Sequence, residues 1–311
     1  MKVSPRPRER AILGQVSDLD LRLMRVFKAV VECGGMAAAE LELNIGTSTV
    51  SRHVKDLETR LGLRLCRRGR GGFALTTEGD RVYHEILQLL GSLEAFRSSI
   101  DDIHRRMAGQ LEVAIFDKTV TNPEARIHLA ISRFAALAPE VRLSVHVDSI
   151  SGIERGLLGG AYQVGVMPTH RSSKTLSYTD LFGETMLLYC GHGHPLFAKN
   201  NEALSWARVR ELRFAGLGYH SPNMELSHRE RLERAATAYD QEAIAALVLS
   251  GEYLGFLPDH YAASFVQAGL LRAVRPQKFS YSCRFASVIR RSPEPSRAIQ
   301  AFADCLLEAH K

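Results

Sequence analysis

The stretch of residues 47–75 constrains the fold most, because it combines a helical apolar pattern with concentrated positive charge. It holds seven Lys or Arg residues and two acidic residues, a net charge of +5. The whole 311-residue chain carries +6, so everything outside this stretch contributes only +1. Such a cluster is typical of an element that binds a polyanion, although a charged face that contacts only water is the simpler alternative.

Three short helices are predicted around this charge. The first begins near Asp18, which can cap it, and ends near Cys33; the second covers about 37–43 and the third about 47–61. The apolar residues of the third helix recur every three or four positions and form an inward stripe: Val50, Val54, Leu57 and Leu61. Its other side carries short hydroxyls and long cations, which contact base edges and phosphates in the major groove. We expect DNA contacts from Thr47, Ser48, Thr49, Ser51, Arg52, His53 and Lys55.

A β-hairpin is predicted after Gly62. Residues 64–68 and 73–75 form its strands, and the Gly-rich basic tip 69–72 lies between them. Arg68 and Arg70 are placed there to contact phosphates or a minor groove. Three short helices followed by a basic hairpin predict a winged helix-turn-helix, which favours nucleic-acid binding over a merely solvated charged face.

Several residues, in order and spacing, resemble the N-terminal domain of LysR-type transcriptional regulators. The resemblance covers residues 18–80 closely and continues along nearly the whole chain. The matching residues are Ala38, Ala39, Leu43, Val50, Ser51, Arg52, Leu57, Glu58, Arg60, Leu61, Gly62, Leu65, Arg68, Gly72, Leu75, Thr76 and Gly79.

This sequence departs from the family pattern at two places. Residues 46–49 read Gly-Thr-Ser-Thr, where the family commonly has Ser-Gln-Pro-Ala, and Cys66 replaces a usual Phe. Gly46 still suits a helix N-cap. Thr47 cannot make the bidentate adenine contact that Gln makes, so the resemblance does not give the base preference at this position.

A long helix is predicted over 77–107, where proline is absent. Its apolar residues are spaced alternately by four and three, a heptad seam that is better explained by a partner helix than by packing on its own domain. We therefore expect a homodimer whose two heads bind DNA with approximate dyad symmetry, and the resemblance further implies a homotetramer. The seam consists of Val82, Ile86, Leu89, Leu93, Phe96, Ile100, Ile103 and Met107.

Beyond Gly109, apolar strand-like runs alternate with helical patterns, which predicts a mostly parallel α/β sheet with ligands at the carboxyl ends of strands. Strands are predicted at 111–116, 141–147, 164–167, 185–190, 214–217, 253–257 and 282–290. Helices are predicted at 123–137, 150–158, 224–235 and 241–250, with a last one opened by Pro293 or Pro295.

The resemblance implies that this part is a two-lobed effector domain like a periplasmic binding protein. The crossover strands are expected near 185–190 and 283–290. The motifs 191–196 and 255–258 match the family, whereas Gln163 stands where the family often has Asp. The predicted division is a flexible basic extension (1–17), the winged domain (18–76), a coiled-coil linker (77–108) and the effector domain (109–311), with lobe I about 109–185 and 285–311 and lobe II about 186–284.

A small-molecule effector is expected between the lobes, at helix N-termini and in loops after strands. Lys118 and His220 suit an acidic group, and Asp117 or Asp240 an amine, although each of these side chains equally suits a cap or a solvated loop. The pattern does not select a ligand class. The expected effector-binding residues are Phe116, Asp117, Lys118, Thr119, Ser149, Ser151, His220, Ser221 and Asp240.

Other classes of function lack comparable support. Nucleotide-binding, hydrolase and zinc-protease motifs are absent, so an enzyme is the weaker alternative. A metal site at His192 and His194 lacks further ligands at a suitable spacing, and neither a metal nor a cofactor is expected. A redox-responsive regulator of the same fold would need Cys190 and Cys283, which lack the electropositive neighbours of a reactive thiolate. A solute-binding protein would leave the basic winged domain unexplained.

Composition and cysteine use indicate where such a protein works. An apolar fraction of 45% and a charged fraction of 24% exclude a disordered or collagen-like chain. The five cysteines form no CxxC pair, no apolar run reaches the length of a membrane span, and the N-terminus is not patterned as a signal peptide. We therefore expect a cytoplasmic, sequence-specific DNA-binding transcriptional regulator controlled by a small-molecule effector.

Overall fold

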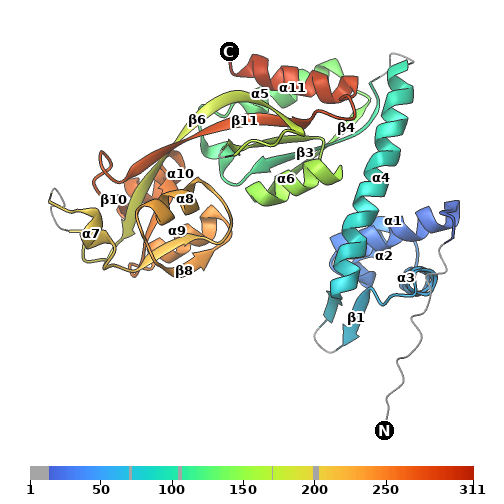
Figure 1. Ribbon diagram of the computed structural model, residues 1–311, viewed down its shortest axis with the longest axis horizontal. Helices are drawn as coiled ribbons and strands as arrows, with labels where there is room; N and C mark the ends of the chain where they lie inside the picture. The colour runs from blue at the N-terminus through green and yellow to red at the C-terminus, as the bar shows by residue number, and fades with distance from the viewer. Residues whose placement is uncertain (1–13, 70–71, 104–106, 170, 199–202) are drawn as a thin grey trace, which may run out of the picture. The chain divides into compact units, whose positions relative to one another are not determined.

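The structure is a computed structural model that describes residues 14–69, 72–103, 107–169, 171–198 and 203–311 (Figure 1). The chain divides into two compact units, unit 1 (Met1–Glu94) and unit 2 (Ala95–Lys311). Within the described ranges, no helix combines the length and the apolar character needed to cross a membrane.

Unit 1 contains three helices and a hairpin, as the sequence predicts. Ser17, and not Asp18, caps the first helix: its hydroxyl accepts from the Asp20 backbone and the Asp20 carboxylate accepts in return. This capping box was hidden because Asp18 is itself a good cap residue. The elements are α1 (Asp18–Glu32), α2 (Met36–Leu43), α3 (Thr47–Leu61), β1 (Cys66–Gly69), β2 (Gly72–Leu75) and the first part of α4 (Thr77–Ile103).

The core of unit 1 confirms the predicted apolar stripe. Val50, Val54 and Leu57 of α3 are fully buried, together with Leu23 and Phe27 of α1. Truncating a buried leucine such as Leu57 to alanine typically costs about 2–5 kcal/mol. The stripe therefore fixes which side of α3 faces inward and which side remains at the surface.

The seam of α4 serves two different purposes along its length. Ile86 is 3% exposed and belongs to the core of unit 1, and Val82 and Leu89 pack against that core. Leu93, Phe96 and Ile100 are exposed, Phe96 at 68%. The prediction of one continuous partner-facing seam was therefore wrong for its first half, because the winged domain itself uses those residues.

The described part of α4 is also shorter than predicted. It ends at Ile103 after 27 residues, or about 40 Å. The side chain of Ile103 and residues 104–106 lie outside the described part of the chain, as do residues 1–13 of the predicted extension.

Unit 2 is built on a nine-stranded sheet with the order β4-β3-β5-β11-β6-β9-β7-β8, and β10 pairs with β6. Pairing is parallel within β4-β3-β5 and within β9-β7-β8, and antiparallel wherever β6 or β11 takes part. The strands are β3 (Gly109–Phe116), β4 (Val141–Asp148), β5 (Val164–Thr169), β6 (Leu176–Gly191), β7 (Phe214–Leu217), β8 (Arg234–Ala238), β9 (Leu254–Pro258), β10 (Leu271–Ala273) and β11 (Ser280–Arg290).

Helices cover the sheet, as Figure 1 shows: α5 and α11 lie on one face of the β4-β3-β5 region and α6 on the other. Phe134 of α5 and Phe302 of α11 make an edge-to-face pair at 5.2 Å in the core. The helical segments are η1 (Thr119–Thr121), α5 (Ile127–Leu137), α6 (Ile150–Gly159), α7 (Trp206–Val209), α8 (Pro222–Arg229), α9 (Gln241–Leu249), α10 (Asp259–Gln267) and α11 (Arg297–Ala309).

The two crossover strands are β6 and β11, which pair with each other from Ser280↔Leu187 to Arg290↔Leu176. They connect the β4-β3-β5 group, here lobe I, to the β9-β7-β8 group, here lobe II. The prediction named the right segments, but β6 begins nine residues earlier than 185 because its first half pairs with β11 inside lobe I.

Two further expectations were wrong in detail, and one helix was missed. The helix predicted at 224–235 ends at Arg229, and the chain then forms β8 because β7 offers it a parallel edge. The helix α10 was not predicted. The last helix begins at Arg297 after Ser296, four residues after Pro293 and two after Pro295.

Candidate DNA-binding surface and effector site

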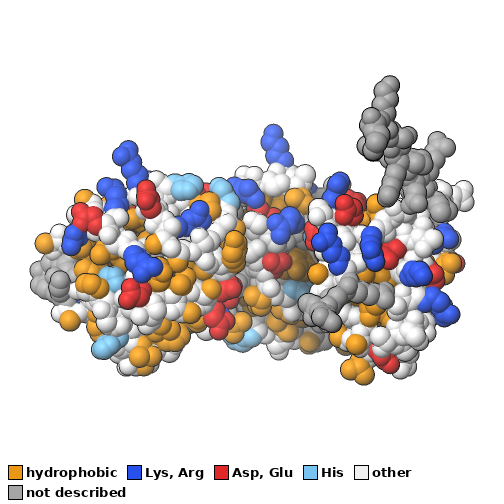
Figure 2. All heavy atoms as spheres, turned by 90° about the horizontal axis from the view of Figure 1, so that it is seen from below, with side chains coloured by type: hydrophobic (Ala, Val, Ile, Leu, Met, Phe, Trp, Pro, Cys, Tyr) orange, Lys and Arg blue, Asp and Glu red, His pale blue; other side chains and the backbone are white. Residues whose placement is uncertain are grey.

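The outer side of α3 carries the predicted mixture of hydroxyls and cations. Ser48, Arg52 and Lys55 are exposed at spacings of four and three, so they lie along one side of the helix. Thr47, Thr49, Ser51 and His53 are half-buried and flank that side. Lys and Arg side chains are spread over the face of unit 1 that Figure 2 shows. This helix therefore presents a polar, basic surface opposite its buried stripe.

An ion pair fixes α3 against α1. The guanidinium of Arg60 forms a bidentate contact with the carboxylate of Asp20, whose side chain is fully buried. The hydrogen bonds from Arg60 and Ser17 hold the pKa of Asp20 well below its usual range. Because Asp20 also belongs to the capping box of α1, one carboxylate joins the start of α1 to the end of α3.

The hairpin is held to α3 by Glu58. Its carboxylate accepts from the backbone amides of Leu65, at 2.8 Å, and Cys66, at 3.3 Å. Gly79 of α4 lies so close to the Leu65 carbonyl that a Cβ there would stand 1.8 Å from the oxygen. These contacts explain physically why Glu58 and Gly79 occur in the matching pattern.

The basic tip of the hairpin is only partly described. The strands pair with Arg68 opposite Phe73 and Gly69 opposite Gly72, which confirms the hairpin, although β1 begins at Cys66 and not at residue 64. The side chain of Arg68, and Arg70 as a whole, lie outside the described residues.

One contact near the start of α3 was not predicted. The hydroxyl of Thr47, the first residue of α3, donates a hydrogen bond to the carboxylate of Glu40 on α2. Both side chains are half-buried. The sequence signal for this pair is weak, because it depends on how the turn after α2 orients the two helices.

In unit 2, several of the predicted effector residues cap helices or belong to the core. Ser149, Ser221 and Asp240 cap α6, α8 and α9 by accepting backbone hydrogen bonds. Phe116 is buried against Phe285, and Thr119 is 1% exposed and donates to the Phe116 carbonyl. These residues cap helices or pack in the core, so a role in ligand binding would come in addition to that structural role.

The remaining predicted residues divide into two groups. His220 is exposed and lies 3.9 Å from Glu225, and Ser151 is half-buried within α6. Asp117 and Lys118 instead connect the lobes. Asp117 accepts from the backbone amide of Gln241, the first residue of α9, at 2.7 Å.

Lys118 makes the second connection between lobes. Its ammonium lies 2.8 Å from Glu242 and 5.2 Å from the centre of the Tyr261 ring. Burial lowers the pKa of Lys118, but the hydrogen bond to Glu242 and the charge of Asp117 outweigh it and raise the pKa overall. The loop after β3 therefore binds lobe II through one carboxylate and one ammonium group.

A third connection runs through a buried histidine that the sequence did not reveal. His260, at the start of α10, lies 2.8 Å from the Thr121 hydroxyl through Nδ1 and 3.0 Å from the Glu184 carboxylate through Nε2. The Glu184 side chain is 3% exposed, and its burial raises its pKa. A charged residue directly before the apolar run 185–190 was the available signal for Glu184.

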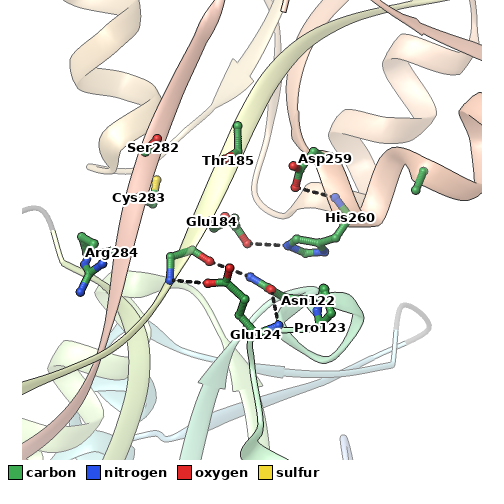
Figure 3. A pocket seen from close by; sticks show the side chains of 12 residues that line it. Asn122, Pro123, Glu124, Glu184, Thr185, Asp259, His260, Ser282, Cys283 and Arg284 are labelled. Carbon is green, nitrogen blue, oxygen red and sulfur yellow. Dashed lines mark hydrogen bonds and ion pairs between the residues drawn. The ribbon is translucent and has the colours of Figure 1, made fainter. Parts of the chain in front are cut away.

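This network borders a cavity of about 610 Å³ beside the crossover strands. Figure 3 shows Glu184 and His260 facing each other there, with Asn122 and Glu124 bonded to the backbone of Gly183. Asp259 also lines the cavity. The lining thus includes three acidic side chains and one cation, Arg284, and Asn122, Glu124, Glu184 and His260 already form hydrogen bonds within the protein.

Two buried polar atoms among the described residues of lobe II have no hydrogen-bond partner in the protein. They are the hydroxyl of Tyr219 and the side-chain oxygen of Gln241, whose residue is 3% exposed. Burial, followed by the charges of Asp117 and Asp240, raises the pKa of Tyr219. Because buried polar groups are nearly always satisfied, these two atoms mark a place for a polar ligand group or a water.

The alternative sites lose support from the geometry. Cys190 pairs with Arg272, and Cys283 stands opposite Glu184, six residues away along β6, or roughly 20 Å. Burial raises the pKa of the Cys190 thiol to about 11 and that of Cys283 further, so neither is a reactive thiolate. A disulfide between these two cysteines is therefore excluded in this arrangement.

The histidines near the end of β6 are structural. His194 is buried, and its Nδ1 accepts from the backbone amide of Leu196. His192 packs edge-on against Phe197. In the part of the chain that the structure describes, no group of three or more His, Cys, Asp or Glu side chains is placed to hold a metal ion.

Comparisons with known proteins agree with this architecture. Residues 104–311 match the family model described as LysR substrate binding domain, and residues 21–80 match the bacterial regulatory helix-turn-helix model of the lysR family. The HTH-type transcriptional activator BauR of Pseudomonas aeruginosa is 40% identical over 94% of this chain and 96% of its own length.

More distant proteins give the same result. The SDS degradation transcriptional activation protein of a Pseudomonas species is 27% identical over 93% of this chain and 96% of its own. Among solved structures, CbnR, titled a LysR family transcriptional regulator, has a TM-score of 0.59 at 18% identity and covers 94% of this chain and 99% of its own. At that identity the structural likeness carries the fold alone.

Proposed function

Because the chain belongs to the LysR family of bacterial transcriptional regulators, we propose that its α3 and hairpin bind promoter DNA and that a small molecule between lobes I and II controls this binding. Family members of this kind are regulators and not enzymes. The relative that is 40% identical is named an activator, which supports positive control of transcription. We place the protein in the cytoplasm, where promoter DNA lies.

The observation that carries the proposal is the two-sided character of α3. Its buried stripe and the Arg60–Asp20 ion pair fix the helix in the unit, while Ser48, Arg52 and Lys55 remain at the surface. A recognition helix in the major groove uses residues of its N-terminal half in this way. Arg52 suits a guanine edge, Ser48 suits either kind of base, and Lys55 suits a phosphate.

The exposed half of the α4 seam supports dimerisation. Leu93, Phe96 and Ile100 follow the heptad spacing and are exposed at 37%, 68% and 41%. A helix that keeps large apolar residues exposed along one line is stabilised by a second copy of itself. Two heads held in this way would recognise two half-sites with approximate dyad symmetry.

The contacts between lobes support control by a ligand. Asp117, Lys118 and His260 connect lobe I, lobe II and β6 in the described arrangement. A ligand that bonds the Tyr219 hydroxyl and the Gln241 side chain would bind next to the Asp117–Gln241 contact and act on it. It would therefore favour one arrangement of the lobes over another, which is the requirement for allosteric control.

Replacing Arg52 by alanine tests the DNA-binding part of the proposal. The operator is first selected from a randomised duplex library, and affinity is then measured by fluorescence anisotropy at physiological salt. Losing one base-reading arginine should weaken binding about tenfold or more. Arg25→Ala removes another exposed arginine, on α1, and should change affinity less than twofold. Equal affinities of the two variants would contradict the assignment of α3.

A further inference from the structure

The contact between Glu40 and Thr47 changes what the start of α3 can offer to DNA. The Thr47 hydroxyl has one hydrogen, and it is donated to the Glu40 carboxylate. What remains on the Thr47 oxygen is lone pairs, which only accept hydrogen bonds. An ionised carboxylate such as that of Glu40 also only accepts. The pair is therefore an acceptor-only surface at the first residue of α3.

The major groove distinguishes bases by the groups that such a surface can sense. Adenine and cytosine present amino groups, which donate, whereas the hydrogen-bonding groups of guanine and thymine there are acceptors only. An acceptor-only surface is attracted to an amino group and repelled by a carbonyl oxygen. A threonine without Glu40 would lack this preference, because its hydroxyl can turn to donate or to accept.

We propose that Glu40, through Thr47, determines base specificity at one position of each half-site and selects adenine or cytosine there. The inference rests on the proposed binding of α3 in the major groove. Glu40 lies on α2, outside the recognition helix, and neither its residue type nor its spacing predicts this role. In this proposal Thr47 contacts the base, and Glu40 is the residue that fixes its polarity.

A purely structural role for Glu40 has a different signature. If the pair only helped α2 pack against α3, removing it would weaken binding to all DNA sequences alike. If the pair selects a base, its removal changes the preference at one position and leaves the other positions unchanged. The pattern of preferences, and not affinity alone, separates the two roles.

The test is selection of binding sites from a randomised duplex library by the full-length protein and by Glu40→Gln. The amide of glutamine can donate to the Thr47 oxygen as well as accept from it, so the Thr47 hydroxyl is no longer committed to donating within the protein. We expect the native chain to prefer adenine or cytosine about tenfold at one position of the half-site. In Glu40→Gln this preference should fall below threefold, with the other positions retained.

Glu42→Gln is the matched control, because it makes the same change of charge on an exposed residue of the same helix. It should retain the native preference at every position. The proposal is overturned if Glu40→Gln keeps the native pattern, or if Glu42→Gln loses the same preference. It is also overturned if the position that responds to Glu40→Gln prefers guanine or thymine in the native chain.

Thr47→Val provides a second test that does not depend on the folding of Glu40→Gln. Valine keeps the shape of threonine and removes the oxygen, so it should lose the preference at the same position. Retention of the native pattern by Thr47→Val would refute the proposal even if Glu40→Gln is unfolded. If the native chain selects no sequence, or Arg52→Ala binds as well as the native chain, the proposed function fails instead.

Discussion

The recognition helix and the effector lobes place their polar side chains in opposite ways. On α3, Ser48, Arg52 and Lys55 lie at the surface, and a buried stripe holds the helix beneath them. Between the lobes, Asp117 and Glu184 are buried or nearly so and already hydrogen-bonded within the protein. The α3 surface can therefore meet a partner without rearrangement, whereas a ligand between the lobes must exchange contacts that the protein already makes. The first arrangement suits recognition and the second suits control.

The largest expected effect comes from breaking the proposed dimer, which separates the α3 helices of its two copies. Replacing both Leu93 and Phe96 by aspartate places charges on the exposed half of the α4 seam. We expect this variant to sediment as a monomer at micromolar concentration, and the native chain to sediment as a dimer. Its operator affinity should fall about a hundredfold, because the two half-sites are no longer bound by one particle.

Ser92→Asp serves as the control for that experiment, since it adds charge to an exposed position of the same helix outside the seam. It should remain dimeric. If the native chain itself sediments as a monomer, each chain binds DNA with one α3 and the proposed dimer is wrong.

A smaller effect is expected between the lobes. Tyr219→Phe removes the buried hydroxyl that has no partner within the described protein. Because that hydroxyl contributes no hydrogen bond to the fold, the melting temperature without ligand should not fall. A metabolite identified by thermal-shift screening, which detects ligands that bind the folded state, should bind about tenfold more weakly by calorimetry.

Tyr239→Phe removes a hydroxyl from a tyrosine that is 69% exposed and should bind the same metabolite like the native chain. If Tyr219→Phe and Tyr239→Phe bind it equally, the ligand does not use the buried groups. The proposed ligand site at Tyr219 and Gln241 would then be wrong.

The difference between α3 and the groups between the lobes also explains what the sequence predicted and what it did not. The bounds of α3 match the prediction because a helix that is buried on one side repeats its apolar residues locally. The Glu184–His260 contact joins residues 76 positions apart, and nothing in either local pattern requires the other. Likewise, the sequence pattern predicts that α8 continues into β8, because the strand forms only through its pairing with β7. Local periodicity revealed the recognition helix, whereas the cavity between lobes is assembled by tertiary contacts.

Removing the Asp20–Arg60 ion pair tests how firmly α3 is held against α1. Asp20→Asn should lower the hydrogen-exchange protection of α1 and α3 at neutral pH and leave α5 unchanged. The pKa of Asp20 is depressed in the folded chain, so its contribution is present above the ordinary range of an aspartate and is lost as the pH falls. The difference between the variant and the native chain should therefore shrink on acidification.

Asp18→Asn changes an exposed aspartate in the first turn of the same helix and should leave protection of α3 unchanged. If the hydrogen-exchange protection of α3 is the same in Asp20→Asn as in the native chain, the ion pair does not hold α3 in place.

The smallest effect is expected for Glu184. Burial raises its folded pKa, so the charged form is disfavoured in the folded chain, and stability declines as the pH rises through that raised value. His260, Asp259 and Asp117 are the charged groups that act on it. Glu184→Gln lacks this decline, so its melting temperature relative to the native chain should rise by a few degrees between about pH 4 and pH 7.

Asp180→Asn, an exposed acid on the same strand, should show no such trend. A difference between Glu184→Gln and the native chain that stays constant with pH would show that the buried carboxylate does not titrate in this range.

In the proposed function, the exposed side of α3, with the hairpin, binds DNA through a basic surface. The salt dependence of operator affinity tests it most directly, because each phosphate contact releases counterions from the duplex. A plot of log affinity against log salt should be linear, with a slope of about −0.9 for every phosphate contacted and a magnitude of several in total. A flat plot would contradict the claim.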